Sequence, residues 1–307
     1  MKLVSVVIPT LDRPTLLLRA IDSVLRQTYC ELELIVIIDK VSPDPETLAA
    51  LRTVTDPRLR FMANPRPGTA AGARNFGVEQ AVGEWIAFLD DDDEWLPAKL
   101  ERQLAFASGR PPALLTCLSR VVTPYATFVT PQVVFDNSIP LDEYMFDRCS
   151  VFAGWNGIQT SSFLLPRTLF EKVRFNVESA HDDWELVLRL SKQIPARVET
   201  VPEVLVVNYF EGPQASLTER SSSWARSFAW VEGMRPILTP RAYSAFCLGA
   251  VGSRAARERA YKAFPLLLHK AFQNGRPRPT QLLPYLAYWI LPFDARKKLR
   301  GMFRKDV

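Results

Sequence analysis

The stretch Gly83-Glu84-Trp85-Ile86-Ala87-Phe88-Leu89-Asp90-Asp91-Asp92-Asp93 joins a continuous apolar run to four consecutive aspartates. The apolar residues 85–89 predict a buried strand, since short runs of this kind bounded by turn residues are typical of strands covered on both faces. Crowded carboxylates at the end of such a strand cost free energy unless a cation or hydrogen-bond donors compensate them. Mg²⁺ and Mn²⁺ prefer oxygen ligands and commonly bridge carboxylates to phosphates. We therefore expect a metal-diphosphate site here, with a solvated acidic turn as the alternative.

Around this stretch, strand-like and helical patterns alternate along the first 122 residues. Because strands that alternate with helices form mainly parallel sheets with helices on both faces, an α/β fold is expected. Ligands of such sheets bind beyond the carboxyl ends of the strands. Polar segments at 10–13, 39–44 and 90–93 follow three of these strands, and we expect them to converge. The expected strands are residues 3–8, 32–38, 59–62, 85–89 and 113–122, and the expected helices are 16–26, 46–54 and 96–107.

The remaining sequence changes character twice. Residues 123–219 mix short strands with loops, then predict a helix at 182–192 and two strands near 197–209. From residue 220 the pattern is helical. This last part holds 17 Lys or Arg against 4 Asp or Glu, so it carries +13 while the preceding residues carry −8. Such asymmetry favours a basic extension that contacts an anionic surface, and simple solubility is the alternative.

Composition narrows the cellular setting. The 307 residues, 48% of them hydrophobic, are enough for a substantial core without disulfides. The four cysteines, Cys30, Cys117, Cys149 and Cys247, are widely spaced and form no Cys-x-x-Cys motif, which fits a reducing cytoplasm. The apolar run at 282–293 is shorter than the roughly 20 residues that span a bilayer, so it is not expected to cross a membrane. It is expected either to lie on a membrane surface or to dock on the catalytic domain with its basic side in water.

Four segments carry a family resemblance: Ser5-Val6-Val7-Ile8-Pro9-Thr10-Leu11-Asp12-Arg13-Pro14, Glu33 to Asp39, Gly68 with Ala73-Arg74-Asn75-Phe76-Gly77, and Gly83 to Asp93. In this order and spacing they resemble the inverting nucleotide-sugar glycosyltransferases of family 2, of the non-processive bacterial type with the GT-A fold. The resemblance covers about residues 3–215. It implies a GT-A domain at 1–219, with a nucleotide-binding half at about 1–122 and an acceptor half at about 123–219, followed by a helical basic extension at 220–307.

The resemblance also implies a donor site with Mn²⁺ or Mg²⁺ as cofactor. Asp92 is then the metal ligand, and Glu211 lies near the position of an extra ligand. Arg74 has two readings, a cationic contact to the nucleotide or a salt bridge to the acidic cluster. The family's usual asparagine is replaced by Asp12, and its usual acidic-acidic-Gly-Ser segment after the second strand is Asp39-Lys40-Val41-Ser42, so the base stays open although a UDP-linked donor is expected. The residues implied in nucleotide binding are Pro9, Thr10, Asp12, Asp39, Arg74, Asp90 and Asp91.

On the acceptor side, His181-Asp182-Asp183-Trp184-Glu185 resembles the family's Glu-Asp motif at the start of a helix. Matching residue by residue makes Asp183 the general base and places Asp182 at the acceptor. The alternative for Asp183 is a carboxylate that interacts with free N–H groups of the helix N-terminus. Trp155 is expected to line the acceptor pocket, since sugar rings stack on aromatic faces, with core packing as the alternative.

The expected function is therefore metal-dependent, inverting transfer of one sugar from a nucleoside-diphosphate sugar to a hydroxyl of a glycan or lipid-linked acceptor. Two other classes remain, a sugar nucleotidyltransferase and a non-catalytic sugar-nucleotide-binding membrane scaffold. The first lacks support because no basic Gly-rich triphosphate loop follows the first strand. We expect a cytoplasmic protein with peripheral contact to anionic membrane and no nucleic acid partner.

Overall fold

The computed structural model describes residues 2–147, 156–194, 196–210 and 223–291. By its internal contacts the chain divides into two compact units. The sheet unit comprises Met1–Val121 and Ile158–Tyr209, and the helical unit comprises Val122–Gly157 and Phe210–Val307. Residues 122–157 thus group with the C-terminal helices, whereas the sequence analysis joins them to the first domain. The functional division into halves stays a prediction.

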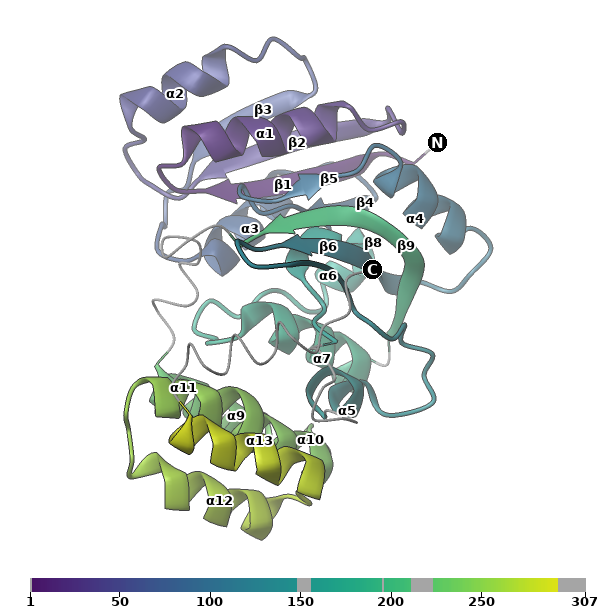
Figure 1. Ribbon diagram of the computed structural model, residues 1–307. Helices are drawn as coiled ribbons and strands as arrows, with labels where there is room; N and C mark the ends of the chain where they lie inside the picture. The colour runs from purple at the N-terminus through teal and green to yellow at the C-terminus, as the bar shows by residue number, and fades with distance from the viewer. Residues whose placement is uncertain (1, 148–155, 195, 211–222, 292–307) are drawn as a thin grey trace. The chain divides into compact units, whose positions relative to one another are not determined.

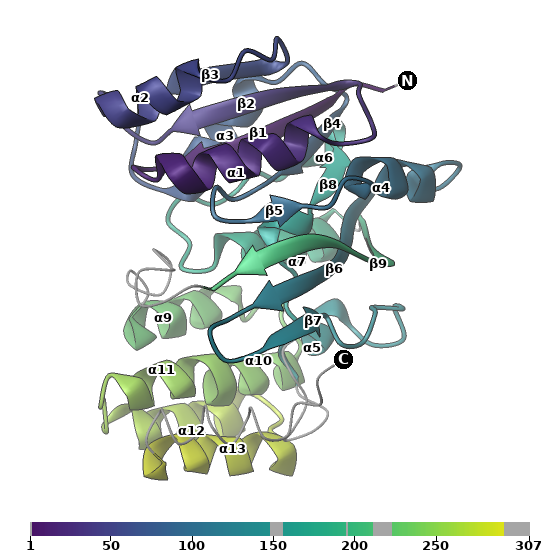
Figure 2. The same ribbon diagram turned by 45° about the horizontal axis from the view of Figure 1, so that its top comes forward.

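A mixed sheet forms the centre of the sheet unit (Figures 1 and 2). Its strand order is β3-β2-β1-β4-β8-β6-β9-β5. The strands β3, β2, β1 and β4 are parallel, while β8 is antiparallel to β4 and β9 is antiparallel to β5. The parallel half thereby directs the carboxyl ends of β1, β2 and β4 to one edge. The strands are β1 (Val4–Thr10), β2 (Leu32–Ile38), β3 (Leu59–Ala63), β4 (Trp85–Phe88), β5 (Glu94–Trp95), β6 (Ala113–Val122), β8 (Leu164–Pro166) and β9 (Arg197–Tyr209).

Helices cover both faces of the parallel strands. Pro14 occupies the first turn of α1, and the helix buries Leu17 and Ile21 in one cluster with Val6 of β1. On the opposite face α3 approaches the sheet so closely that a Cβ on Gly77 would lie 2.4 Å from Val7 Cγ1. The helices of this unit are α1 (Pro14–Leu25), α2 (Pro45–Arg52), α3 (Ala70–Gln80), α4 (Lys99–Ala107), α6 (Arg167–Phe170) and α7 (Asp182–Gln193), with a short 3₁₀ turn η1 (Thr160–Ser162).

The α/β class, the strands β1, β2, β3, β4 and β6, and the helices α1, α2, α4 and α7 agree with the prediction to within a few residues. Two details of the secondary structure were predicted wrongly. Helix α3 was not predicted, because its small residues allow close approach to the sheet and leave little apolar periodicity. The two strands expected near 197–209 are one strand, β9, whose exposed Pro202 and Glu203 interrupt the apolar pattern without ending the strand.

The helical unit packs around aromatic side chains. The rings of Phe146 and Phe246 lie 4.9 Å apart, and Trp230 lies 5.0 Å from Phe246. Within the described residues, we find no helix that is long and apolar enough to cross a membrane. The elements of this unit are β7 (Thr127–Thr130), α5 (Leu141–Phe146), α9 (Trp224–Met234), α10 (Pro240–Phe246), the π-helical turn η2 (Cys247–Val251), α11 (Gly252–Arg257), α12 (Ala263–Asn274) and α13 (Pro279–Ile290).

Candidate functional site

Four aspartates, Asp90 to Asp93, form an acidic turn directly after β4. The ends of two neighbouring strands reach it. Thr10 at the end of β1 donates its hydroxyl hydrogen bond to Asp91 over 2.7 Å, and the Thr10 carbonyl accepts from the Asp39 N–H over 2.8 Å. Lys40 forms an ion pair with Asp12. The expected convergence of the three polar segments is therefore confirmed.

Arg13 joins two carboxylates of the acidic turn. Its Nη1 lies 2.8 Å from Asp92 Oδ2, while Nε donates to Asp91 Oδ2 over 3.2 Å and Nη2 pairs with Asp91 Oδ1. Burial raises the pKa of the Asp91 carboxyl to about 7, although Arg13 and Thr10 act to lower it. The sequence analysis includes this arginine in the converging polar segment 10–13 but gives it no role of its own.

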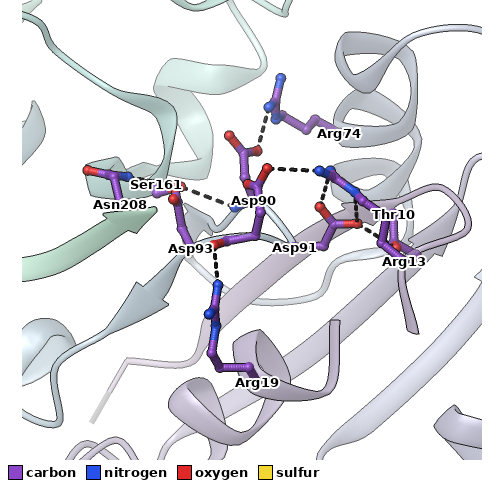
Figure 3. Close-up of polar contacts among 10 residues, drawn as sticks. Thr10, Arg13, Arg19, Arg74, Asp90, Asp91, Asp93, Ser161 and Asn208 are labelled. Atoms are coloured by element: carbon purple, nitrogen blue, oxygen red, sulfur yellow. Dashed lines mark hydrogen bonds and ion pairs between the residues drawn. The ribbon is translucent and has the colours of Figure 1, made fainter. Parts of the chain in front are cut away.

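Arg74 of α3 connects the acidic turn to the start of α7. Its Nη2 lies 2.6 Å from Asp90 Oδ1 (Figure 3), and its Nη1 lies 3.0 Å from Asp182 Oδ2. The guanidinium is buried and lies 5.2 Å from the ring centroid of Phe175. Of the two readings for Arg74, the salt bridge is present, and a nucleotide contact stays a prediction. The next residue after Asp182 is Asp183, whose pKa is raised to about 7 by desolvation and by the Asp182 charge.

Asp93 faces the protein interior on the other side of the turn. It is 7% exposed, and it accepts hydrogen bonds from Ser161 Oγ over 2.5 Å and Asn208 Nδ2 over 2.6 Å. Figure 3 shows these partners reaching the turn from other segments of the sheet unit. Asn208 at the end of β9 and Ser161 of η1 cover Asp93, so this part of the turn is not solvated. Sequence spacing contains no signal for these partners.

Arg19 of α1 binds the backbone of the same turn. Its Nη2 donates to the Asp92 carbonyl oxygen over 2.6 Å, and its guanidinium lies 4.0 Å from the centroid of the Tyr209 ring. The Tyr209 hydroxyl in turn donates to Glu94 over 3.0 Å. At Asp92 the backbone of the acidic turn thus has an anchor that does not involve a carboxylate.

Other predicted nucleotide contacts lie at the β2 and β3 ends. The Asp39 carboxylate accepts from Asn64 Nδ2 over 2.8 Å and from the Gly68 N–H over 3.1 Å, which orders the loop before α3. A cavity of about 440 Å³ opens beside this loop and includes Gly68 and Phe76 in its lining. Pro9 is buried in β1. The predicted residues Trp155 and Glu211 lie outside the described residues.

The acidic turn fits a divalent cation that is bound partly by carboxylates of the turn and partly by a diphosphate. Asp92 remains 24% exposed, and desolvation and the neighbouring Asp90 charge raise its pKa, a repulsion that a dication relieves. Over the described ranges, no group of three or more His, Cys, Asp or Glu side chains is arranged to hold a metal by itself. The turn offers one or two accessible carboxylates, and Mg²⁺ commonly binds such carboxylates together with the phosphates of a substrate.

Comparisons with known proteins agree with this fold. The chain is 28% identical over 251 residues to the amylovoran biosynthesis glycosyltransferase AmsB of Erwinia amylovora, a match that covers 77% of this chain and 79% of that protein. It is 39% identical over 103 residues to the UDP-Glc:alpha-D-GlcNAc-diphosphoundecaprenol beta-1,3-glucosyltransferase WfgD of Escherichia coli, covering 34% of this chain and 40% of that protein.

Solved structures show the same fold at low identity. S. aureus TarS superposes with a TM-score of 0.55 at 18% identity, over 99% of this chain and 52% of that chain. The mannosyltransferase PcManGT from Pyrobaculum calidifontis, in complex with GDP-Man and Mn²⁺, gives a TM-score of 0.55 at 17% identity, over 98% of this chain and 84% of that chain. The profile of Glycosyl transferase family 2 matches residues 5–173. Since this match spans more than half of the chain and includes the acidic turn, the protein belongs to glycosyl transferase family 2.

Proposed function

We propose that the protein transfers one sugar from a UDP-linked donor to a hydroxyl of a lipid-linked glycan, with inversion and with a divalent metal, in the synthesis of an envelope polysaccharide. The observation that carries this proposal is the connection through Arg74. It holds Asp90 of the acidic turn and Asp182 at the start of α7 on one guanidinium. A site for the charged leaving group and a carboxylate with a raised pKa, Asp183, therefore lie next to each other.

The donor side uses charge and hydrogen bonds. The nucleoside is bound by Thr10, Asp39 and Asp91, and the hydrogen bonds of Thr10 to the other two residues hold this set together. The metal is held by Asp92 together with oxygens of the diphosphate. The metal, when bound, supplies positive charge that stabilises the departing diphosphate. Arg74 stays paired with its carboxylates and keeps the donor and acceptor sides at a fixed separation.

The acceptor side supplies the base. Asp183 accepts the proton of the acceptor hydroxyl while that oxygen forms the new bond to the anomeric carbon, and the bond from that carbon to the diphosphate breaks on the opposite side. A single displacement of this kind inverts the anomeric configuration. A base is most effective when its pKa lies near the working pH, and the pKa of Asp183 is raised to about 7.

The names of the relatives support the proposed donor and acceptor classes. WfgD is named for a UDP-glucose donor and a diphosphoundecaprenol-linked acceptor, and AmsB for amylovoran biosynthesis. PcManGT was solved with Mn²⁺, although its donor is GDP-Man. We therefore infer the divalent metal from the acidic turn and from PcManGT, and the lipid-linked acceptor from the name of WfgD. The uracil base is inferred from the UDP-glucose donor of WfgD and from the position of Asp39.

The test is the variant Asp183→Asn. Binding of UDP and Mn²⁺, measured by calorimetry, should persist, while turnover of UDP-sugars with a polyprenyl-diphosphate-linked glycan falls by about 10² to 10⁴-fold. Asp22→Asn, on the exposed side of α1, is the matched control and should retain activity. Undiminished turnover of Asp183→Asn would refute the base. Formation of pyrophosphate from a sugar 1-phosphate and UTP would instead assign nucleotidyl transfer.

We also propose that the helical unit contacts an anionic membrane on its cytoplasmic face. One side of α13 exposes Leu283, Leu286 and Ile290, spaced three and four positions apart, with 61%, 43% and 77% of their surface accessible. Residues 259–291 contain five Lys or Arg and no Asp or Glu. An apolar stripe in a cationic surrounding suits the interface of an anionic bilayer.

Vesicle flotation measures this contact. The full chain should float with phosphatidylglycerol vesicles at low salt and much less with neutral phosphatidylcholine vesicles. Leu283→Asn combined with Ile290→Asn should reduce flotation, whereas Val82→Asn, an equally exposed site in the sheet unit, should not. Equal flotation of all three proteins would contradict a role for α13.

A further inference from the structure

The carboxylate of Asp92 can pair either with Arg13 or with the proposed metal ion. Asp92, the carboxylate proposed to hold the metal, already accepts from Arg13 Nη1 at 2.8 Å through its Oδ2 atom. Arg13 is 28% exposed and Asp92 is 24% exposed, so the pair lies at the accessible side of the turn. A guanidinium at this distance occupies one lone-pair direction of the carboxylate and neutralises the charge that attracts a dication.

The contacts of Arg13 are unequal. Two of its nitrogens, Nε and Nη2, bind Asp91, which is fully buried, and only Nη1 reaches Asp92. Thr10 also donates to Asp91 and keeps that carboxylate in place. Arg13 can therefore release Asp92 by a small rotation while it remains attached to Asp91. The Asp92 backbone does not depend on Arg13, because Arg19 binds the Asp92 carbonyl oxygen.

The backbone before Arg13 is consistent with such a movement. Asp12 has a φ of 53°, in the left-handed region that residues other than glycine rarely adopt. Residues held in this region persist only where the surrounding structure maintains the strain, and they cluster at active sites, ligand clamps and switch regions. Asp12 is exposed, and its ion pair is with Lys40 of the loop after β2. A rearrangement at Asp12 thus needs no change in the core.

We propose that Arg13 is a resident counter-ion of Asp92 that the metal must displace, so that the metal binds well only when a nucleoside diphosphate supplies further oxygen ligands. This inference rests on the proposed metal-dependent transfer. Arg13 is then a positioning residue. It holds the acidic turn ready while the donor is absent, and it makes metal binding conditional on the donor. A purely structural role for Arg13 would predict the opposite effect on metal affinity, because a disordered turn binds metal less tightly.

The experiment measures Mn²⁺ binding by electron paramagnetic resonance of free Mn²⁺, first without nucleotide and then with UDP. The full chain is compared with Arg13→Gln, which removes the charge, and with Arg13→Lys, which keeps a charge that cannot span two carboxylates. Arg26→Gln is the matched control, because Arg26 is an exposed arginine whose partner is Asp22 on α1. Melting temperatures are recorded for every protein.

Without nucleotide, Arg13→Gln should bind Mn²⁺ about tenfold more tightly than the unsubstituted chain, the order expected when a charge-assisted competitor is removed. Arg13→Lys should fall between the two, and Arg26→Gln should match the unsubstituted chain. UDP should strengthen Mn²⁺ binding more in the unsubstituted chain than in Arg13→Gln.

Equal or weaker Mn²⁺ binding by a folded Arg13→Gln, with UDP-dependent binding retained in the unsubstituted chain, would overturn the displacement alone. If Arg13→Gln does not fold, the same comparison is made with Arg13→Lys, and binding no tighter than in the unsubstituted chain overturns the displacement. Absence of Mn²⁺ binding in all four proteins, even with UDP, would overturn both the displacement and the metal-dependent transfer.

Discussion

Replacing Arg74 by methionine removes the cation shared by Asp90 and Asp182 and leaves both carboxylates without it. The Arg74 side chain is 7% exposed, whereas Asp90 and Asp182 are 32% and 24% exposed. Removing one partner of a buried ion pair costs roughly 3 to 5 kcal/mol, and the partial exposure of the partners places this case near the lower end, about 3 kcal/mol. For a unit of this size each kcal/mol lowers the melting temperature by about 2 to 4 °C, so a decrease of about 6 to 12 °C is expected.

The same substitution changes the titration of the base. Arg74 acts to lower the pKa of Asp183, while desolvation and the Asp182 and Asp90 charges raise it. Without Arg74 the pKa of Asp183 rises further. Since the base works only when deprotonated, the activity profile of Arg74→Met should shift to higher pH, and raising the pH should restore part of the lost turnover.

Calorimetry and pH-rate profiles of Arg74→Met and Arg74→Lys provide the measurement. Lysine keeps the charge but contacts both carboxylates poorly, so Arg74→Lys should lose less stability and show a smaller shift in pH. An Arg74→Met protein that melts within 2 °C of the unsubstituted chain, with an unshifted profile, would refute the reasoning that Arg74 couples the two carboxylates.

Three further predictions concern neighbouring features. For the unsubstituted chain, kcat should rise with pH through about 7, because Asp183 is protonated below that pKa and cannot accept the acceptor proton; a profile flat from pH 5.5 to 8.5 would contradict this assignment. Ser161→Ala removes a hydrogen-bond donor to the buried Asp93 and an acceptor for the Asp90 N–H, so it should lower the free energy of unfolding by about 1 to 3 kcal/mol in denaturant titrations. The exposed Ser108→Ala is the comparison, and no loss relative to it would count against these contacts. Gly77→Ala places a Cβ 2.4 Å from Val7 Cγ1 and should lower the free energy of unfolding by about 1 to 3 kcal/mol. Gly233→Ala, with open space around the new Cβ, should leave this free energy unchanged or raise it slightly. Equal free energies of unfolding for the two variants would show that α3 can move away from the sheet at little cost.

The sequence predicted the parts of the site that depend on local order. Asp90 to Asp93 follow an apolar run, Thr10 and Asp39 follow two others, and parallel pairing brings such strand ends together. It did not predict which side-chain donor meets which carboxylate of the turn. Arg13 and Asn208 lie 78 and 115 residues from their aspartate partners, and such pairings depend on strand order and helix rotation, which apolar periodicity does not report.

Asp93 has a consequence for the construction of chimeric proteins. Three segments distant in sequence meet at its carboxylate, which Ser161 and Asn208 close off. A chimera that exchanges the region between η1 and β9 with a relative must therefore inherit Ser161, Asn208 and Asp93 as one set. It must also keep Asp182, because this residue of the exchanged region pairs with Arg74 outside it.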